Sequence, residues 1–225
     1  MEYILEGICN QNGRETNMDS LLLTERKISG TRSVLAVVCD GVGSLSDGAY
    51  ASVESIRMLN EWFAMLDGTE RAGLVLRDEI SSINTRIIAA AKGNGMNTAT
   101  TLSALLLVGR QYYIVHAGDS RIYSIDGSGL TQLTIDTVNE SGALTSGIGH
   151  FDNAELYYSE GMVQSDMFLL CSDGLYKRID DAWIFENIHA GNRKALRKTL
   201  SALSDQAIAQ GERDNISIAI VKLLK

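Results

Sequence analysis

The chain of 225 residues contains no proline, three cysteines and three histidines. The lack of proline excludes proline-rich recognition segments and cis-proline turns. The cysteines are odd in number and form no C-x-x-C pair, which argues against a disulfide framework or a cysteine zinc site. The histidines, which include His189, stand singly and form no H-E-x-x-H motif. The sequence therefore points away from zinc and disulfide chemistry.

Positive charge and long apolar runs are also scarce. The chain carries 20 Lys and Arg against 28 Asp and Glu, a formal net charge of -8, with a pI of about 4.9. This balance works against binding to nucleic acids or to an anionic membrane surface. Apolar stretches such as Leu102–Val108 are too short to span a bilayer, and the N-terminal MEYILEG lacks the basic start of a signal peptide. We expect a cytoplasmic monomer with no nucleic-acid or membrane partner.

Hydrophobic residues, in contrast, make up 45% of the chain. A chain of this length can bury a substantial core. We find no linker-like change in composition, no low-complexity tract and no repeat of fixed period. We therefore expect residues 1–225 to form a single domain.

The apolar patterns predict helices and many short strands. Helical spacing of apolar side chains covers residues 47–66 and 74–91, and residues 180–188 and 193–209 also look helical. Strand-like segments cover residues 3–9, 21–28, 34–39, 100–108, 111–117, 121–125, 130–133, 154–158, 167–171 and 216–223. Short strands at such close spacing favour antiparallel sheets over a doubly wound parallel sheet.

The most informative stretch is VLAVVCDGVGSLS, residues 34–46, where a continuous apolar run ends in Asp40-Gly41. A plain Asp-Gly turn is the simplest interpretation. A dinucleotide-binding fingerprint fits poorly, because Ser46 replaces the third glycine and Asp40 would face the pyrophosphate. The third interpretation is a metal ligand, since an ionised carboxylate at the tip of a buried strand needs a cation or another partner.

Acidic residues recur at other strand and loop boundaries, namely Asp19, Asp119, Asp173 and Asp214. Each alone reads as a turn or loop residue, but together they suggest convergence. Carboxylates that converge repel each other unless cations neutralise them, and an all-oxygen site favours Mg²⁺ or Mn²⁺ over zinc. Such a site suits phosphoester hydrolysis. Arg14 is the natural phosphate anchor, because a guanidinium can hold two phosphate oxygens at once.

The ordered motifs of the chain resemble those of the metal-dependent PPM protein phosphatases, the type 2C class, and particularly its bacterial members. The motifs are Arg14 with NMD at 17–19, VVCDGVGS at 37–44, TATTL at 98–102, HAGDSRIY at 116–123, LLCSDGLY at 169–176 and RDNIS at 213–217. They span nearly the whole chain. The resemblance implies an α+β fold, a four-layer αββα sandwich of two antiparallel β-sheets flanked by helix pairs.

The resemblance also implies a metal centre that binds Mn²⁺ or Mg²⁺. Asp40 would bridge two ions, and the carbonyl of Gly41 would bind the second. Asp173 and Asp214 would complete the shell of the first ion. Asp119, together with Asp173, would hold a looser third ion.

Two further residues receive catalytic roles from the resemblance. Asp19 would orient water on the metal, and Arg14 would bind the substrate phosphate. The implied reaction is hydrolysis of phosphoserine or phosphothreonine in proteins, in one direct step by hydroxide formed on the metal. The partners would be phosphorylated proteins, including a Ser/Thr kinase or its substrates, which this enzyme would oppose.

Several positions depart from the family pattern. Val42 stands where many eukaryotic members have a histidine, and Met18 replaces an acidic residue. Residues 133–149 resemble a much shortened flap, with Thr137 in place of a common histidine. The alternative hypothesis is therefore a weak or inactive phosphatase-fold module that binds phosphoproteins or a regulatory partner.

Overall fold

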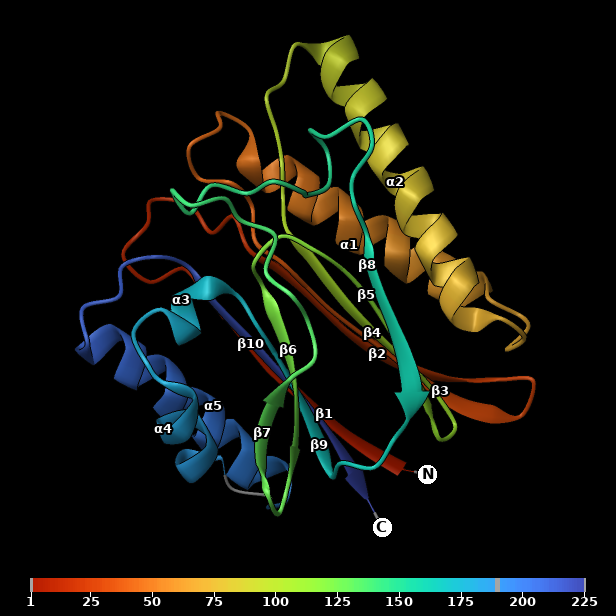
Figure 1. Cartoon of the computed structure of the whole chain (residues 1–225), viewed down its shortest axis with the longest axis vertical. Coiled ribbons are helices and arrows are strands. Elements are labelled where there is room, and N and C mark those ends of the chain that lie inside the picture. Colours follow the sequence, from red (N-terminus) through yellow and green to blue (C-terminus); the bar gives the residue numbers. More distant parts are fainter. Residues whose placement is uncertain (1, 189–190, 225) are drawn as a thin grey trace.

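Two five-stranded antiparallel sheets form the centre of the computed structural model, which describes residues 2–188 and 191–224 (Figure 1). His189 lies outside the described residues. The first sheet has the strand order β1 (Glu2–Asn10), β10 (Ile216–Leu224), β9 (Met167–Cys171), β6 (Arg121–Asp126) and β7 (Gly129–Gln132). The second has the order β2 (Ser20–Ile28), β3 (Thr31–Cys39), β4 (Leu102–Val108), β5 (Gln111–Ala117) and β8 (Tyr157–Met162).

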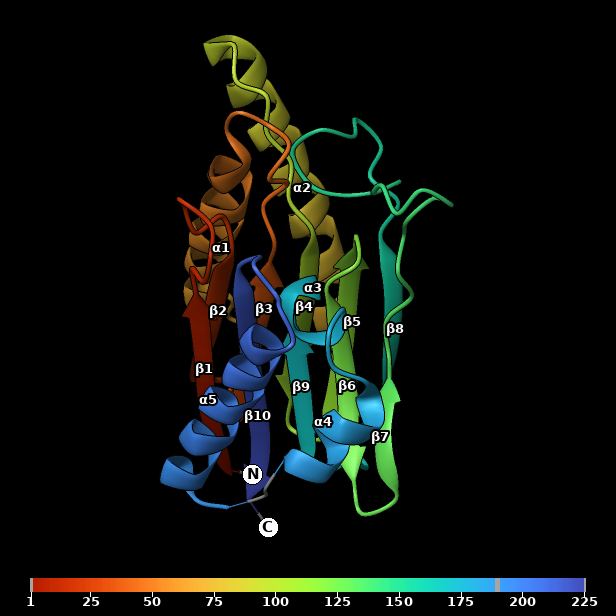
Figure 2. The same cartoon turned by 90° about the vertical axis from the view of Figure 1, so that its left-hand side faces the viewer.

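Helices cover the outer face of each sheet (Figures 1 and 2). The helices α1 (Gly48–Met65) and α2 (Ala72–Asn94) pack on the second sheet. The helices α3 (Asp173–Tyr176), α4 (Asp181–Asn187) and α5 (Arg193–Ala209) pack on the first. The layers follow in the order helices, sheet, sheet, helices, which confirms the predicted αββα sandwich.

Strand β3 shows why its sequence has no polar face. Val34, Ala36 and Val38 point into the core between the two sheets. The alternate residues, among them Leu35 and Val37, point into the core beneath α1 and α2. A strand buried on both faces has to be apolar at every position, so that the run ends where the strand leaves the sandwich.

Most elements differ from the sequence prediction by at most three residues at either end, and two differ more. Strand β8 covers Tyr157–Met162 rather than residues 154–158. It lies at the edge of its sheet and is only partly buried, so its polar residues Ser159 and Glu160 hide it from a hydrophobicity pattern. The short helix α3 was not expected at all, because Asp173-Gly174 reads as a turn.

The antiparallel pairing of β1 with β10 fixes the two ends of the described chain. Glu2 pairs with Leu224 at one end of this ladder, and Asn10 pairs with Ile216 at the other. The segments that carry Arg14 and Asp214 therefore leave the sheet at the end opposite the termini, as Figure 1 shows. Among the helices of the described residues, none combines the length and the apolar character that crossing a bilayer requires.

Candidate active site

The loop that follows β3 is held in place by the segment before β4. The backbone N–H of Asp40 donates to Oγ1 of Thr101 at 2.9 Å, and the N–H of Thr101 donates to the carbonyl of Asp40, also at 2.9 Å. Gly41 is required by close packing, because a Cβ there would lie 2.6 Å from the carbonyl oxygen of Gly48 and 2.7 Å from that of Met18. The Asp40-Gly41 pair is thus packed against the segments of Met18, Gly48 and Thr101 and is more than a plain turn.

The second Asp-Gly pair has a similar cause. A Cβ on Gly174 would lie 2.1 Å from the carbonyl oxygen of Asn215, so only glycine allows α3 to begin directly against the segment before β10. Asp173 is the first residue of this helix. The preceding Ser172 donates from Oγ to Oδ2 of Asp19 at 2.9 Å, which ties the polar loop before β2 to the end of β9.

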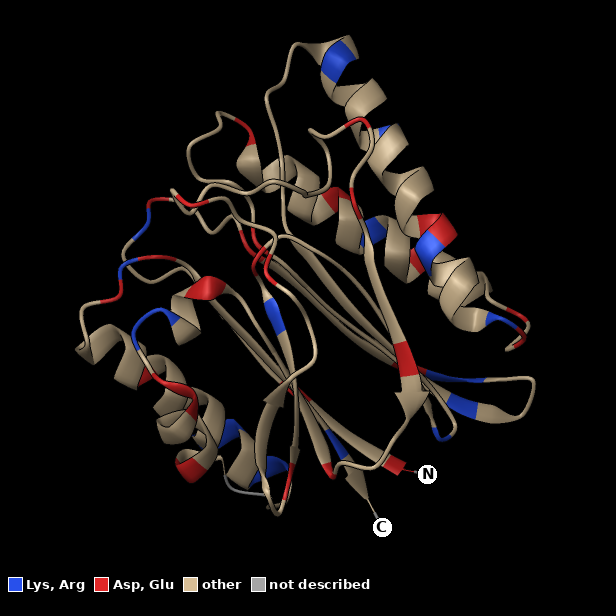
Figure 3. Ribbon diagram, in the orientation of Figure 1, with Lys and Arg blue, Asp and Glu red and all other residues tan. Residues whose placement is uncertain are grey.

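The predicted acidic residues come from both sheets and gather at one end of the sandwich, close to the start of α3 (Figure 3). Asp19 and Asp119 are buried, whereas Asp40 and Asp173 keep a partial opening to solvent. Burial raises the pKa of Asp40 well above its usual value, and the charges of Asp19, Asp173 and Asp119 add to the rise. Four carboxylates therefore share one region of space, as the sequence predicted.

Two further carboxyl groups of this cluster hold protons more tightly than usual. Burial is the main cause that raises the pKa of Asp19 to about 6 and that of Asp119 to about 6. The charge of Asp173 contributes to both shifts. In the described part of the chain, Oδ1 of Asp19 and Oδ1 of Asp173 are buried without a hydrogen-bond partner. Within the described residues, the donors and cations around the cluster therefore leave these two carboxylate oxygens unsatisfied.

These properties fit a divalent cation, because such an ion would satisfy the unpartnered oxygens and offset the repulsion among the carboxylates. The side chains themselves do not close around a single point: among residues 2–188 and 191–224, no three His, Cys, Asp or Glu are arranged to hold a metal ion. The donor set, all carboxylate, still selects a hard ion such as Mg²⁺ or Mn²⁺.

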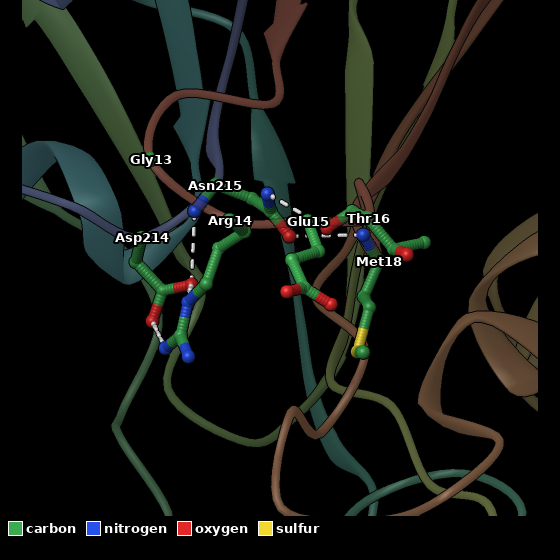
Figure 4. A pocket seen from close by; sticks show the side chains of 7 residues that line it. All are labelled: Gly13, Arg14, Glu15, Thr16, Met18, Asp214 and Asn215. Atoms are coloured by element: carbon green, nitrogen blue, oxygen red, sulfur yellow. Dashed lines mark hydrogen bonds and ion pairs between the residues drawn. The ribbon is translucent and has the colours of Figure 1, made fainter.

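Arg14 and Asp214 lie side by side in the lining of a cavity of about 350 Å³ (Figure 4). The guanidinium donates from Nε to Oδ1 of Asp214 at 2.8 Å and from a terminal nitrogen to Oδ2 at 2.6 Å. Burial opposes ionisation of Asp214, but the hydrogen bonds and charge of Arg14 outweigh it and lower its pKa. The structure thus places the predicted phosphate anchor on a predicted metal ligand. The cavity is lined by Gly13, Arg14, Glu15, Thr16, Met18, Asp214 and Asn215.

Sequence reasoning missed three residues that shape this site. Asn215 accepts from the backbone N–H of Met18 at 2.9 Å and donates to the carbonyl of Gln11 at 2.8 Å, so it anchors the loop that carries Arg14. Tyr176 donates to the carbonyl of Asp119 at 2.8 Å, and Lys177 forms an ion pair with Asp173. All three lie in or beside the recognised motifs, and that position was the signal available in the sequence.

The shortened flap is tied to the loop between β5 and β6, which carries Asp119. The N–H of Thr137 donates to the carbonyl of Gly118 at 2.7 Å, and the N–H of Gly118 donates to Oγ1 of Thr137 at 2.8 Å. Asp136 pairs with Arg121 at 2.8 Å. Thr137, which replaces a histidine of the family pattern, therefore has a structural function in this chain.

His116 supports the same loop from inside the sandwich. Its Nε2 lies 3.1 Å from the carbonyl oxygen of Ile135, and its Nδ1 lies 2.9 Å from Oγ of Ser103. Burial lowers the pKa of His116 to about 4, so that the ring is neutral at physiological pH. This histidine is a buried structural residue and not a ligand of the carboxylate cluster.

Comparison with known proteins agrees with this geometry. A family model described as protein phosphatase 2C matches residues 13–211. The serine/threonine phosphatase stp of Listeria welshimeri is 29% identical over 216 residues, which cover 84% of either chain. The serine/threonine protein phosphatase PstP of Mycobacterium tuberculosis is 27% identical over 219 residues, which cover 84% of this chain and 40% of PstP.

Solved structures show the same fold. Serine/threonine phosphatase Stp1 from Staphylococcus aureus superposes with a TM-score of 0.90 at 21% identity, covering 100% of this chain and 96% of Stp1. The catalytic domain of PstP in complex with two manganese ions superposes with a TM-score of 0.81 at 24% identity, covering 100% of both chains. The arrangement of sheets and helices is therefore shared across wide sequence divergence.

Proposed function

Because this chain belongs to the protein phosphatase 2C family, we propose that it is a metal-dependent enzyme that hydrolyses phosphoserine and phosphothreonine in proteins. Relatives from Listeria and Mycobacterium carry the name serine/threonine phosphatase, which supports this substrate class. The observation that carries the proposal is the convergence of carboxylates from both sheets beside the Arg14 cavity.

We propose that the metal centre binds Mn²⁺ or Mg²⁺, with two ions and a looser third. Asp40, with the carbonyl of Gly41, would hold the central ions, and Asp173 and Asp214 would complete the shell of the first. Asp119, with Asp173, would hold the third. The PstP catalytic domain in complex with two manganese ions supports the first two ions and the kind of metal. When bound, such ions supply positive charge that activates water and neutralises the phosphoryl oxygens.

Among the residues of the chain, Arg14 is the one that we propose binds the substrate phosphate. Its side chain is half exposed and already holds two carboxylate oxygens of Asp214 in a fork. A phosphate presents the same pair of oxygens to such a fork. We propose that substrate phosphate takes the place of Asp214 on this guanidinium, which would leave Asp214 free to hold the metal.

We propose that Asp19 acts on the attacking water. Its Oδ2 is held by Ser172, whereas its Oδ1 is buried and lacks a partner in the described residues. Oδ1 of Asp19 can accept a hydrogen bond from the attacking water and so orient the lone pair of the water oxygen towards phosphorus. We assign Asp19 this orienting function, and the departing serine or threonine oxygen recovers a proton from solvent.

We also propose the setting in which the enzyme works. It is a cytoplasmic monomer that acts on phosphorylated proteins and opposes a Ser/Thr kinase. The negative net charge of -8 favours substrates with basic residues near the phosphorylated side chain.

The test is hydrolysis of a phosphothreonine peptide, with and without Mn²⁺, by the natural protein and by Asp40→Asn. We expect Mn²⁺-dependent release of phosphate that falls by about a hundredfold or more in the variant, since a removed electrostatic group typically costs that much. Asp152→Asn is the matched control, because this aspartate is 74% exposed and pairs with Lys92 at the surface. Equal rates for all three proteins would refute the assignment of Asp40.

The same assay separates the enzyme from an inactive binding module. A module would bind Mn²⁺ or phosphopeptide without turnover, and Asp40→Asn would then change binding alone. Turnover in the natural protein that vanishes without Mn²⁺ would exclude the module.

A further inference from the structure

Lys177 lies at the end of α3, four residues after Asp173, and its ammonium pairs with Oδ2 of that aspartate. The two side chains differ in exposure: that of Lys177 is 53% exposed, whereas that of Asp173 is 13% exposed. The lysine therefore reaches from the surface into the edge of the carboxylate cluster. The preceding residue, Tyr176, donates from its hydroxyl to the backbone of Asp119 and so ties α3 to that side of the site.

The charge of Lys177 acts on more than its direct partner. It attracts Asp119 and Asp40 as well as Asp173, and it favours ionisation of Asp214. An ordinary ion pair between residues four apart on a helix is screened by water and stabilises the fold by little. Arg57 and Glu61 form such a pair on α1, where both side chains are about half exposed or more. Lys177 instead pairs with a largely buried aspartate that lies beside other carboxylates.

We propose that Lys177 is a built-in cation of the metal site, which neutralises the Asp119–Asp173 side and so weakens the binding of a divalent ion there. This inference rests on the proposed function, since it assumes that the cluster binds Mn²⁺ or Mg²⁺. It deepens that proposal by assigning a residue that sets how many ions the site holds at ordinary metal concentrations.

The balance of charge supports the assignment. Five carboxylates, Asp19, Asp40, Asp119, Asp173 and Asp214, face two cationic side chains, Arg14 and Lys177. Arg14 pairs directly with Asp214, whereas Lys177 pairs directly with Asp173, which together with Asp119 would hold the looser ion. An ammonium beside that position repels a divalent ion with twice the strength that it repels a monovalent one. The ammonium of Lys177 therefore neutralises part of the carboxylate charge that the third ion would otherwise neutralise.

The test is Mn²⁺ titration of the natural protein and of Lys177→Met, followed by calorimetry and by the electron paramagnetic resonance signal of free Mn²⁺. Methionine keeps most of the length of the side chain and removes the charge. We expect the weakest Mn²⁺ binding step to tighten by about tenfold or more at low salt. Lys177→Arg, which keeps the charge, should bind Mn²⁺ as weakly as the natural protein. Lys92→Met is the matched control, because it removes a surface lysine that pairs with Asp152.

A double variant and circular dichroism protect the test against misfolding. Adding Asp119→Asn to Lys177→Met should abolish the gain in affinity, because it removes a carboxylate that the more tightly bound ion would use. Affinities within about twofold of the natural protein in Lys177→Met, at unchanged circular dichroism, would overturn the inference while leaving the phosphatase proposal intact. Failure of the natural protein to bind any Mn²⁺ would overturn both.

Discussion

Replacing Asp19 by asparagine should stabilise the metal-free protein, although it removes a residue of the proposed site. The pKa of Asp19 is raised to about 6, from 3.8, mainly by burial. Between these two values the folded state binds more protons than the unfolded state, so stability falls as the pH rises through this window. Above about pH 6 the ionised carboxylate therefore destabilises the fold, and the full difference amounts to about 3 kcal/mol at most.

Asparagine removes this cost while its oxygen can still accept the hydrogen bond from Ser172. In urea unfolding with EDTA at pH 7.5, we expect Asp19→Asn to be more stable than the natural protein by up to about 3 kcal/mol, and by about half of that at pH 5. With saturating Mn²⁺ the order should reverse, because the carboxylate then has a cation nearby. An asparagine variant less stable than the natural protein in EDTA at pH 7.5 would refute the reasoning.

Two further predictions concern packing and acid stability. Gly174→Ala should destabilise the fold by roughly 1–3 kcal/mol and weaken Mn²⁺ binding, because its Cβ would lie 2.1 Å from the carbonyl oxygen of Asn215. Gly93→Ala in α2 should instead stabilise the fold by up to about 1 kcal/mol, because nothing lies within 4 Å of the added Cβ. Urea unfolding of both variants checks this, and equal effects would contradict it. His116→Gln should reduce the loss of stability between pH 7 and pH 5 by roughly 2 kcal/mol. Below pH 6.5 the unfolded chain binds a proton at His116, whereas the folded state, in which the pKa of His116 is about 4, does not. Thermal unfolding at the two pH values checks this, and an unchanged difference between them would count against it.

The sequence was sufficient for the layers and for most of the elements. Strand β5 and helix α5 have the predicted bounds, because their apolar spacing is regular and glycine or polar residues follow each of them. Strand β8 and helix α3 were misplaced or missed, since their positions depend on an edge of the sheet and on one close contact of Gly174. Local pattern carries no information on either cause.

The candidate site could be predicted as a set of residues but not as an arrangement. The acidic strand ends identified Asp40, Asp119 and Asp173, and the structure brings them together. The pairing of Arg14 with Asp214 was not foreseen, because residues 200 positions apart meet only in the fold. The reach of Lys177 to Asp173 was also missed, because a spacing of four predicts contact only once a helix is recognised.

The pairing of Glu2 with Leu224 also bears on how the chain could be rewired. A short linker between these neighbouring positions would cost little closure entropy. The chain could then be reopened at Gly127, in the turn between β6 and β7, where a Cβ would meet nothing within 4 Å. Such a circular permutant would make β10 and β1 a hairpin, so that the strand leading to Arg14 and the strand following Asp214 would be synthesised together.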